Sequence, residues 1–210
     1  MRIDKRYKVW LAAATEKSDR EVLQHVLIEK TDGEWSTSDG FKGPKGVAVA
    51  GNGFMLGVVP VELDEEDVPG LVQAHIFQQA HRGIAKHNAY VDLILRDTQA
   101  SFLGKLGMMH CDRRNSYMKQ YPDIPFPNWR GIVPPMPDMD SQPKGALAIL
   151  PSQLKDMADV LGIEVPIIIR TAPQNTMQDE RGEGPLILRG PNANGSIEPP
   201  YGLLMPYWER

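Results

Sequence analysis

The histidines and the single cysteine are the residues best suited to bind a metal ion, but their spacing argues against a site. His75, His81 and His87 are six residues apart. On one helix each would be rotated by about 240° from the last, so they could not converge. Residues 110–112 (His-Cys-Asp) form a local cluster, yet no second pair lies at ligand spacing from it. We therefore expect no metal ion and no cofactor.

No segment carries a recognisable catalytic motif. Residues 40–46 (Gly-Phe-Lys-Gly-Pro-Lys-Gly) have the composition of a phosphate loop, but they lead into a strand-like Val-Ala-Val rather than a helix, and we interpret them as a flexible basic loop. The acidic run 64–67 is interpreted as a solvated turn. The chain holds no nucleophile elbow, His-Glu-x-x-His motif or Cys-x-x-Cys pair. The protein is therefore predicted not to be an enzyme.

The composition is that of a globular protein from a reducing compartment. Of 210 residues, 41% are hydrophobic and 24% charged, which is ordinary for such proteins. No apolar run approaches the ~20 residues needed to cross a bilayer, and no signal peptide is recognisable. Cys111 is the only cysteine, so no internal disulfide is expected. We expect a cytoplasmic protein without a membrane partner.

The charge balance leaves two interpretations of the basic residues open. The net charge is −4, so the surface as a whole is unsuited to bind nucleic acid. Cations could still gather on the predicted helices and form a track that faces a polyanion. They could equally be ordinary solvated helix faces. The candidates for such a track are Lys5, Arg6, Lys8 and Lys17 on the first predicted helix, with His75, Arg82 and Lys86 on or beside the second.

Glycines and prolines divide the chain into short elements. Helices are predicted at 5–17, 76–84 and 152–161. Strands are predicted at 23–29, 47–50, 54–63, 90–96, 102–111 (one or two strands), 146–150, 165–170, 185–189 and 202–207. Gly51-Asn52-Gly53 predicts a hairpin turn.

The order strand, helix and three strands repeats, which predicts an α+β fold with antiparallel sheets and helices on one face. The third copy is clear, the first nearly so, and the middle copy looks degraded. We divide the chain into a two-repeat domain at 1–126, a connector at 127–144 and a third repeat at 145–210. The density of prolines from 122 to 143 predicts that this stretch is extended and crosses between modules.

Two segments resemble signatures of the bacterial DNA sliding clamp, the beta subunit of DNA polymerase III. Residues 126–134 (Phe-Pro-Asn-Trp-Arg-Gly-Ile-Val-Pro) are similar to its interdomain segment, commonly Phe-Pro-Asp-Tyr-Arg-Arg-Val-Ile-Pro. Residues 201–208 (Tyr-Gly-Leu-Leu-Met-Pro-Tyr-Trp) are similar to its ending, Tyr-Val-Val-Met-Pro-Met-Arg. The resemblance implies clamp domains, each a pair of strand–helix–three-strand repeats, whose helices face double-stranded DNA.

In the clamp family these two segments form a groove that receives short peptides from polymerases and other partners. The alternative is that the same residues are core and turn positions, kept for packing. The peptide groove implied by the resemblance would consist of Pro127, Ile132, Leu203 and Met205, with Pro206 shaping its exit. The DNA-facing residues implied by it would be Lys5, Arg6, Lys8, Arg82 and Lys86.

The chain also departs from the family pattern. It holds three repeats where a bacterial clamp protomer has six, and residues 130–131 are Arg-Gly rather than Arg-Arg. Three repeats amount to one and a half clamp domains, which would leave one sheet edge unpaired. An unpaired edge predicts a homo-oligomer. The leading hypothesis is a non-catalytic, processivity-factor-like protein of DNA replication that associates with DNA, docks partners, or both. The alternative is a clamp-fold structural or protein-interaction module without DNA binding, of phage or mobile-element origin.

Overall fold

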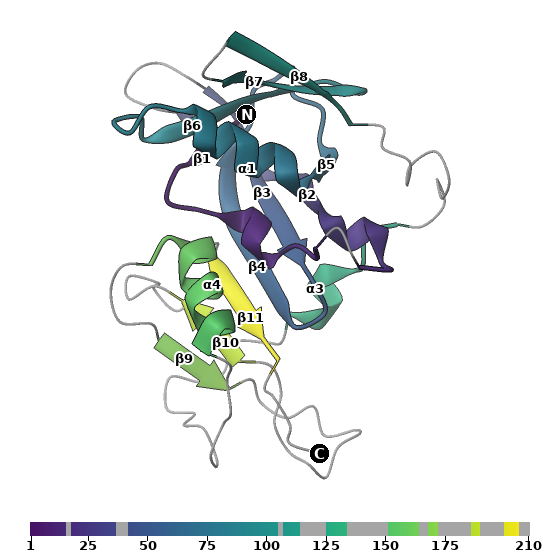
Figure 1. Cartoon of the computed structure of the whole chain (residues 1–210), viewed down its shortest axis with the longest axis vertical. Coiled ribbons are helices and arrows are strands. Elements are labelled where there is room, and N and C mark those ends of the chain that lie inside the picture. Colours follow the sequence, from purple (N-terminus) through teal and green to yellow (C-terminus); the bar gives the residue numbers. More distant parts are fainter. Residues whose placement is uncertain are drawn as a thin grey trace.

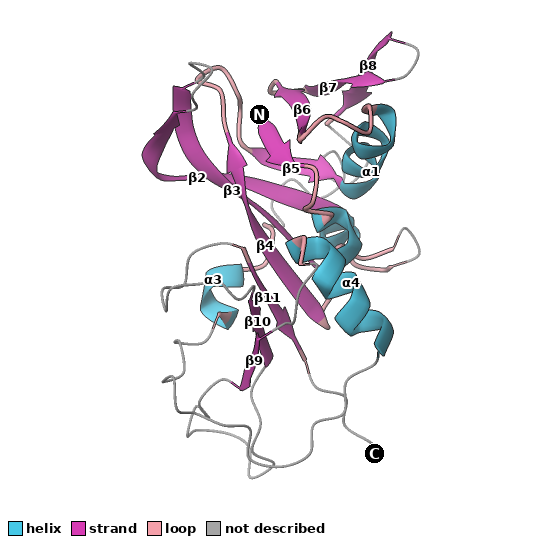
Figure 2. Cartoon of the chain, turned by 90° about the vertical axis from the view of Figure 1, so that its left-hand side faces the viewer, coloured by secondary structure: helices cyan, strands magenta, loops and turns pink. Residues whose placement is uncertain are grey.

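The computed structural model describes residues 1–15, 18–36, 42–104, 107–113, 125–133, 151–163, 168–171, 186–189 and 200–205. The described strands join into one antiparallel sheet of eleven strands. Helices α1 (Ala74–Gly83) and α4 (Pro151–Leu161) pack on one face of this sheet, and the single helical turn α3 (Trp129–Ile132) lies on the other (Figures 1 and 2). Among the described residues, no helix has the length and apolar character that crossing a membrane would require.

The elements follow one another as repeats of a strand, a helical segment and three strands, so the predicted α+β class is confirmed. The first repeat contains β1 (Arg2–Asp4), the 3₁₀ turns η1 (Val9–Ala12) and η2 (Glu21–Gln24), β2 (His25–Ser36), β3 (Lys42–Gly51) and β4 (Met55–Glu62). The second contains β5 (Gly70–Gln73), α1, β6 (Tyr90–Leu95), β7 (Gln99–Gly104) and β8 (Gly107–Asp112). The third contributes α4, β9 (Ile168–Thr171), β10 (Leu186–Arg189) and β11 (Tyr201–Leu204).

Strand pairing links the three repeats. The first two repeats exchange their first strands: β1 of the first repeat pairs with β6 of the second, and β5 of the second repeat pairs with β2 of the first. Strand β4 lies at the junction: β3 runs along one of its edges, and the other edge takes β1 at Glu62 and β11 along Met55–Val58. β10 and β9 extend the sheet beyond β11. The third repeat therefore continues the sheet of the first.

The predictions for a helix at 5–17 and for a degraded middle repeat are both wrong. The second repeat is complete, and residues 5–15 contain only the 3₁₀ turn η1. Alanines favour an α-helix by propensity, but this segment lies between α1 and α4. Its backbone is engaged elsewhere, since Lys8 N–H donates to Asp159 O and Ala14 N–H donates to Leu23 O. Tertiary contacts override local propensity here.

The interpretation of residues 40–46 as a flexible loop is wrong for residues 42–46, which belong to β3. The glycines in this part of the strand allow close packing. A Cβ added to Gly46 would lie 2.8 Å from the Glu29 carbonyl oxygen of β2 and 2.8 Å from the Leu63 side chain. Gly46 therefore marks a place where neighbouring segments of the same chain approach closely, rather than a turn.

The acidic run 64–67 is only partly solvated, which corrects its interpretation as a solvated turn. The Asp67 side chain is buried and forms an ion pair with the Met1 ammonium group. Its carboxylate also accepts hydrogen bonds from the backbone N–H groups of Leu95 (3.0 Å) and Asp64 (2.8 Å). Asp67 thus holds the turn against β6, and burial of a carboxylate is tolerated because it is fully paired.

Apolar side chains form clusters on both faces of the sheet. The main core lies between the sheet and the helices, and includes Ile76, Phe77 and Met157. A second cluster lies on the opposite, outer face and contains Val47, Val49, Leu56, Val58, Trp129, Ile187, Tyr201 and Leu203. This outer cluster brings together the first repeat, the connector and the end of the third repeat.

The connector is described only in part. Within residues 125–133 the single turn α3 is the only helix, and Asn128 caps it by accepting a hydrogen bond from Gly131 N–H. The rest of the proline-rich stretch and the predicted strand at 146–150 lie outside the described residues. The domain boundaries and the extended course of the connector therefore stay predictions.

Candidate functional site

A groove of about 410 Å³ opens on the outer face of the sheet, beside α3. Four segments of the chain line it: residues 20–23 at η2, the β3–β4 turn, the connector around α3, and the end of β11. Apart from Arg20 and two glycines, every residue that lines the groove has an apolar side chain. The groove is therefore suited to apolar side chains of a ligand.

The β3–β4 turn forms one wall, and the predicted hairpin at this position is confirmed. Asn52 Oδ1 accepts hydrogen bonds from the N–H groups of Phe54 and Met55, both at 2.9 Å. Gly53 has φ of +92°, a conformation that favours glycine. This turn leaves Phe54 62% exposed at the rim, and Met205 N–H donates to Phe54 O at 2.8 Å.

The strand pair β4–β11 forms the floor. Its register sets Leu203 opposite Leu56, and both side chains are nearly buried. Met205 follows directly after β11 and is 45% exposed at the rim. Ile132, from α3, is 56% exposed on the opposite side. Buried leucines with exposed apolar side chains around them give a preformed binding groove.

Helix α3 forms the other wall and is fastened to β2 by Glu29. Trp129 Nε1 donates to Glu29 Oε2 at 3.0 Å, and Arg130 Nη1 lies 2.7 Å from the same oxygen. The Arg130 guanidinium also lies over the Trp129 ring, 4.2 Å from its centre. A single carboxylate thus orients both the indole and the guanidinium.

The groove carries little charge. Arg20, at its rim, is exposed and is the only charged side chain among the described residues that line it. Tyr201 lies in the outer cluster, where burial raises its pKa to about 12, even though Arg130 and Arg189 act in the opposite direction. Its phenol is therefore neutral at physiological pH. An apolar groove with one cation at its rim fits a ligand with apolar groups and one negative charge.

The structure brings most of the predicted groove residues together. Pro127, Ile132, Leu203 and Met205 all line this groove, whereas Pro206 lies outside the described residues. Sequence reasoning missed the contributions of Arg20, Leu23, Phe54 and Trp129. The aromatic residue directly after the predicted hairpin turn was a usable signal, because a phenylalanine at a tight turn has little core to enter.

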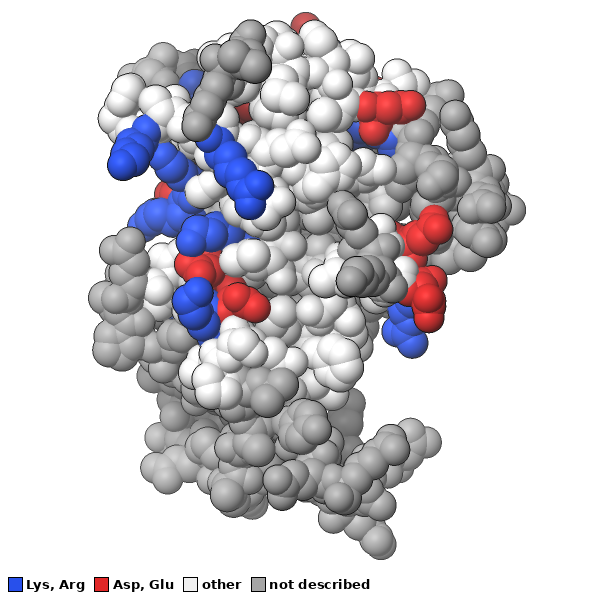
Figure 3. Space-filling view, in the orientation of Figure 1, with Lys and Arg blue, Asp and Glu red and all other residues white. Residues whose placement is uncertain are grey.

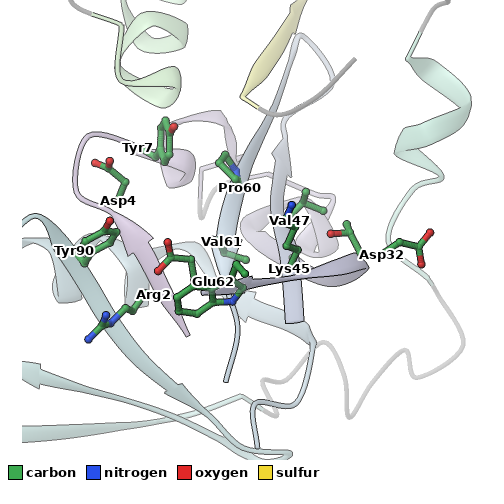
Figure 4. A pocket seen from close by; sticks show the side chains of 13 residues that line it. Arg2, Asp4, Tyr7, Asp32, Lys45, Val47, Pro60, Val61, Glu62 and Tyr90 are labelled. Atoms are coloured by element: carbon green, nitrogen blue, oxygen red, sulfur yellow. The ribbon is translucent and has the colours of Figure 1, made fainter. Parts of the chain in front are cut away.

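A second hollow, of about 510 Å³, is lined by charged as well as apolar side chains (Figure 4). It lies where β1 meets β4, and carboxylates such as Glu62 and cations such as Lys45 share it. Arg2 lies over the Tyr90 ring at 5.8 Å and forms an ion pair with Asp92 at 3.1 Å. Mixed charges of this kind give no net preference for an anion or a cation, so the apolar groove is the stronger candidate.

The predicted DNA-facing cations lie around the segment after β1 and the end of α1. Lys5 Nζ donates to the carbonyl oxygens of Ala85 (2.9 Å) and Lys86 (3.1 Å), just beyond α1. Arg82 and Lys86 are exposed. Figure 3 shows Lys and Arg side chains gathered on one side of the face that carries α1 and α4, with acidic side chains beside them.

Two of these cations are paired with carboxylates. Arg6 Nη2 lies 2.7 Å from Asp4 Oδ2, and Lys8 Nζ lies 2.6 Å from Asp159 Oδ1 on α4. The carboxylates reduce the positive potential of this surface. The structure therefore places the predicted cations in one region, but it leaves only part of their charge available.

Among the described residues, no group of three or more His, Cys, Asp or Glu side chains could hold a metal ion. His81 packs against Trp10 with ring centres 4.9 Å apart, and its Nε2 lies 2.9 Å from Lys5 O. His110 Nδ1 lies 2.7 Å from Ser101 Oγ. These histidines therefore have packing and hydrogen-bonding roles within the sheet and its helices.

Repeats of a strand, a helical segment and three strands, with helices on one face of a continuous antiparallel sheet, define the fold of the DNA sliding clamps, and this chain has that fold. Similar solved structures include two of the Caulobacter crescentus beta sliding clamp, each 14% identical, with TM-scores of 0.61 and 0.53. DNA polymerase III subunit beta from Borrelia burgdorferi, in complex with a natural product, is also 14% identical, with a TM-score of 0.52. All of this chain is covered in each case, but it spans only 65%, 65% and 63% of those chains. No protein-family model and no curated protein matches the sequence.

Proposed function

We propose that the protein is a non-catalytic, clamp-fold docking protein that binds short peptide segments of partners, such as a replication polymerase, in the apolar groove. The observation that carries this proposal is the convergence of two segments that are far apart in the sequence. Residues 127–132 and 203–205, both singled out as groove segments, line one preformed apolar cavity. A shared core would bury these side chains, whereas Ile132 and Met205 stay about half exposed.

The groove specifies the chemistry of the peptide. Two bulky apolar side chains would fill the space between Phe54, Ile132 and Met205. A carboxylate near one end of the peptide would lie close to Arg20. Apolar anchors in a preformed groove supply affinity, and one charge pair at the rim sets the orientation.

Binding of a labelled short peptide with one acidic residue, a leucine and a phenylalanine tests the proposal by fluorescence anisotropy. Ile132→Asp should weaken binding by about tenfold or more, because a charge replaces an exposed apolar anchor. Ile94→Asp is the matched control, since Ile94 is 43% exposed on β6, outside the groove, and should leave affinity unchanged. Equal binding by both variants would contradict the proposal.

Association with double-stranded DNA is the second candidate function, and the cations around the end of α1 support it. Retention on closed-circular DNA compared with linear DNA, at low and moderate salt, tests whether the protein encircles or lies along a duplex. No binding to either form would favour the alternative of a protein-interaction module without a DNA role. We also propose that the protein is a cytoplasmic homo-oligomer with a part in DNA replication, as its fold and lone Cys111 suggest.

A further inference from the structure

A third hollow, of about 600 Å³, lies between the first half of α1 and the 3₁₀ turns η1 and η2. Figure 1 shows this N-terminal part of the chain, in purple, beside α1. We call it the α1 hollow. It shares no lining residue with the peptide groove or with the second hollow. Its volume is in the range of pockets that bind small molecules, so it is a separate candidate site.

Amide side chains line the α1 wall of this hollow. Gln73 directly precedes α1 and Gln78 lies in its second turn, and both are half-buried. Within the described part of the chain, neither of these two amides forms a hydrogen bond. Gln24 of η2 adds a third amide, whose Nε2 donates to Ser18 O at 3.1 Å. The amides of Gln73 and Gln78 can therefore offer both donors and acceptors to a ligand.

The wall contributed by η1 is apolar and contains one aromatic ring. It consists of Trp10 and Leu11, followed by Ala13 and Ala14. Trp10 is only partly buried. An indole beside small apolar side chains offers a surface on which a flat ring can stack.

The hollow itself carries little charge. No lysine or arginine among the described residues lines it, and Glu21 is the only carboxylate there. Burial lowers the pKa of His25, which keeps this lining residue neutral at physiological pH. Phosphate would find no cation inside the hollow. A neutral, flat ligand with donors and acceptors on its edge fits the lining better.

The predicted DNA-facing cations begin on the other side of Trp10. The Trp10 ring lies 4.9 Å from that of His81, whose Nε2 lies 2.9 Å from Lys5 O. Arg82 follows His81 and is exposed. A DNA strand whose phosphates contact Lys5 and Arg82 would therefore have a base close to Trp10 and the hollow behind it.

We propose that the α1 hollow binds one unpaired base of DNA, with a preference for adenine. The base stacks on Trp10, and the Gln78 amide bonds to the adenine edge. A glutamine amide has the acceptor for N6–H and the donor for N7 that this edge requires. The proposal rests on the DNA association proposed above, which supplies the phosphate contacts. It goes beyond that function because contacts to phosphates alone do not distinguish bases.

Fluorescence anisotropy with two labelled duplexes tests the proposal. One duplex has a single bulged adenosine, and the other has an abasic residue in the same bulge, so their phosphates are equal in number. The wild type should bind the adenosine bulge about tenfold more tightly, because stacking and a bidentate amide contact each contribute on that scale.

Gln78→Leu should remove this preference and leave the affinity for the abasic duplex unchanged. Leucine keeps the bulk and the helix propensity of glutamine, but it lacks the amide. Gln79→Leu is the matched control, because Gln79 is the next residue of α1, is exposed and does not line the hollow. It should keep the preference for adenosine.

The outcomes separate the hollow from DNA association. Equal binding of both bulges by the wild type would overturn the proposal and leave DNA association standing. Equal loss of the preference in both glutamine variants would also overturn it. If neither duplex binds, DNA association fails, and calorimetric titration with free adenosine tests the hollow alone. Saturable binding that Gln78→Leu abolishes would then support base recognition, whereas no binding would overturn it.

Discussion

Glu29 determines how α3 is held above the groove. Its carboxylate accepts the Trp129 indole N–H at 3.0 Å and pairs with the Arg130 guanidinium at 2.7 Å. Glu29→Gln keeps an acceptor for the indole but removes the charge that holds Arg130. We expect peptide affinity to fall by about three- to tenfold, because the wall loses part of its orientation. Anisotropy titration of the peptide measures this effect.

Glu34→Gln is the control for that substitution. Glu34 is an exposed glutamate on the same strand, so its neutralisation changes the net charge equally without touching α3. Wild-type affinity for Glu29→Gln would show that the ion pair plays no part in forming the groove. The thermal midpoint should change little in either variant, since partly exposed ion pairs contribute on the order of 1 kcal/mol or less.

His25 makes stability depend on pH. Burial lowers its pKa, against the opposing effect of its ring contact with the Glu21 carbonyl oxygen at 3.0 Å. A histidine whose pKa is lowered in the fold binds its proton more readily when unfolded. The stability that this provides is present above the unfolded pKa of about 6.5 and is lost as the pH falls below it.

Urea unfolding between pH 7.5 and 5 measures that loss. His25→Phe should flatten the dependence of the unfolding free energy on pH, by at most about 1.4 kcal/mol per pH unit. His87→Phe serves as the control, because His87 is exposed after α1. An unchanged slope for His25→Phe would show that this ring does not set the pH dependence.

Two short motifs singled out residues that the structure brings together, whereas residues whose place depends on contacts between elements were not singled out. Pro127, Ile132, Leu203 and Met205 came from two short segments and lie together in the groove. Phe54 belongs to the groove because the β3–β4 turn lies beside the end of β11, and Glu29 because α3 lies against β2. No local pattern contains that information, because the contacts join residues from different elements.

Helix α4 rests on a pair of glycines at the junction of the first and third repeats. Gly57 of β4 lies opposite Gly202 of β11. A Cβ added to Gly57 would lie 2.5 Å from Val160 Cγ1, and one added to Gly202 would collide with the Met157 side chain. Both glycines therefore let the helix approach the sheet closely, where it covers the pairing of β4 with β11.

Gly57→Ala should lower the free energy of unfolding by about 1–3 kcal/mol, because the added methyl group overpacks this contact. Denaturant unfolding measures the loss. Val160→Ala supplies the matched test, since it removes the methyl groups that the new Cβ would meet. The double substitution should cost less than the sum of the two single ones. Additive costs would mean that the helix does not pack on this glycine as described.

Elements were predictable where their determinants are local. Gly51-Asn52-Gly53 makes its turn through the Asn52 side chain and one positive φ, and the sequence pattern identified it. Helix α4 begins and ends close to its predicted bounds, and Gly162 stops it with φ of +61°. The segment at 5–15 was mispredicted because its hydrogen bonds go to α4 and η2, which its own residues do not reveal.

At the scale of the molecule, the two candidate interfaces lie on opposite faces of one sheet. The groove belongs to the outer face, beside α3, and the cations belong to the face that carries α1 and α4 (Figures 2 and 3). A peptide in the groove would therefore not compete with a polyanion at the helices. Helices on one face of a sheet leave the other face free, and this arrangement accounts for the separation.

Charge on the helix-bearing face supplies the test of DNA association for the whole molecule. Asp4 and Asp159 neutralise Arg6 and Lys8 there. Asp4→Asn combined with Asp159→Asn should therefore tighten binding to duplex DNA and steepen its salt dependence by about one unit of slope for each added phosphate contact. Asp92→Asn is the control, because Asp92 pairs with Arg2 beside the second hollow. Mobility shifts over a salt series measure the binding of both variants. Equal binding by the wild type and both variants would place the bound DNA away from α1 and α4.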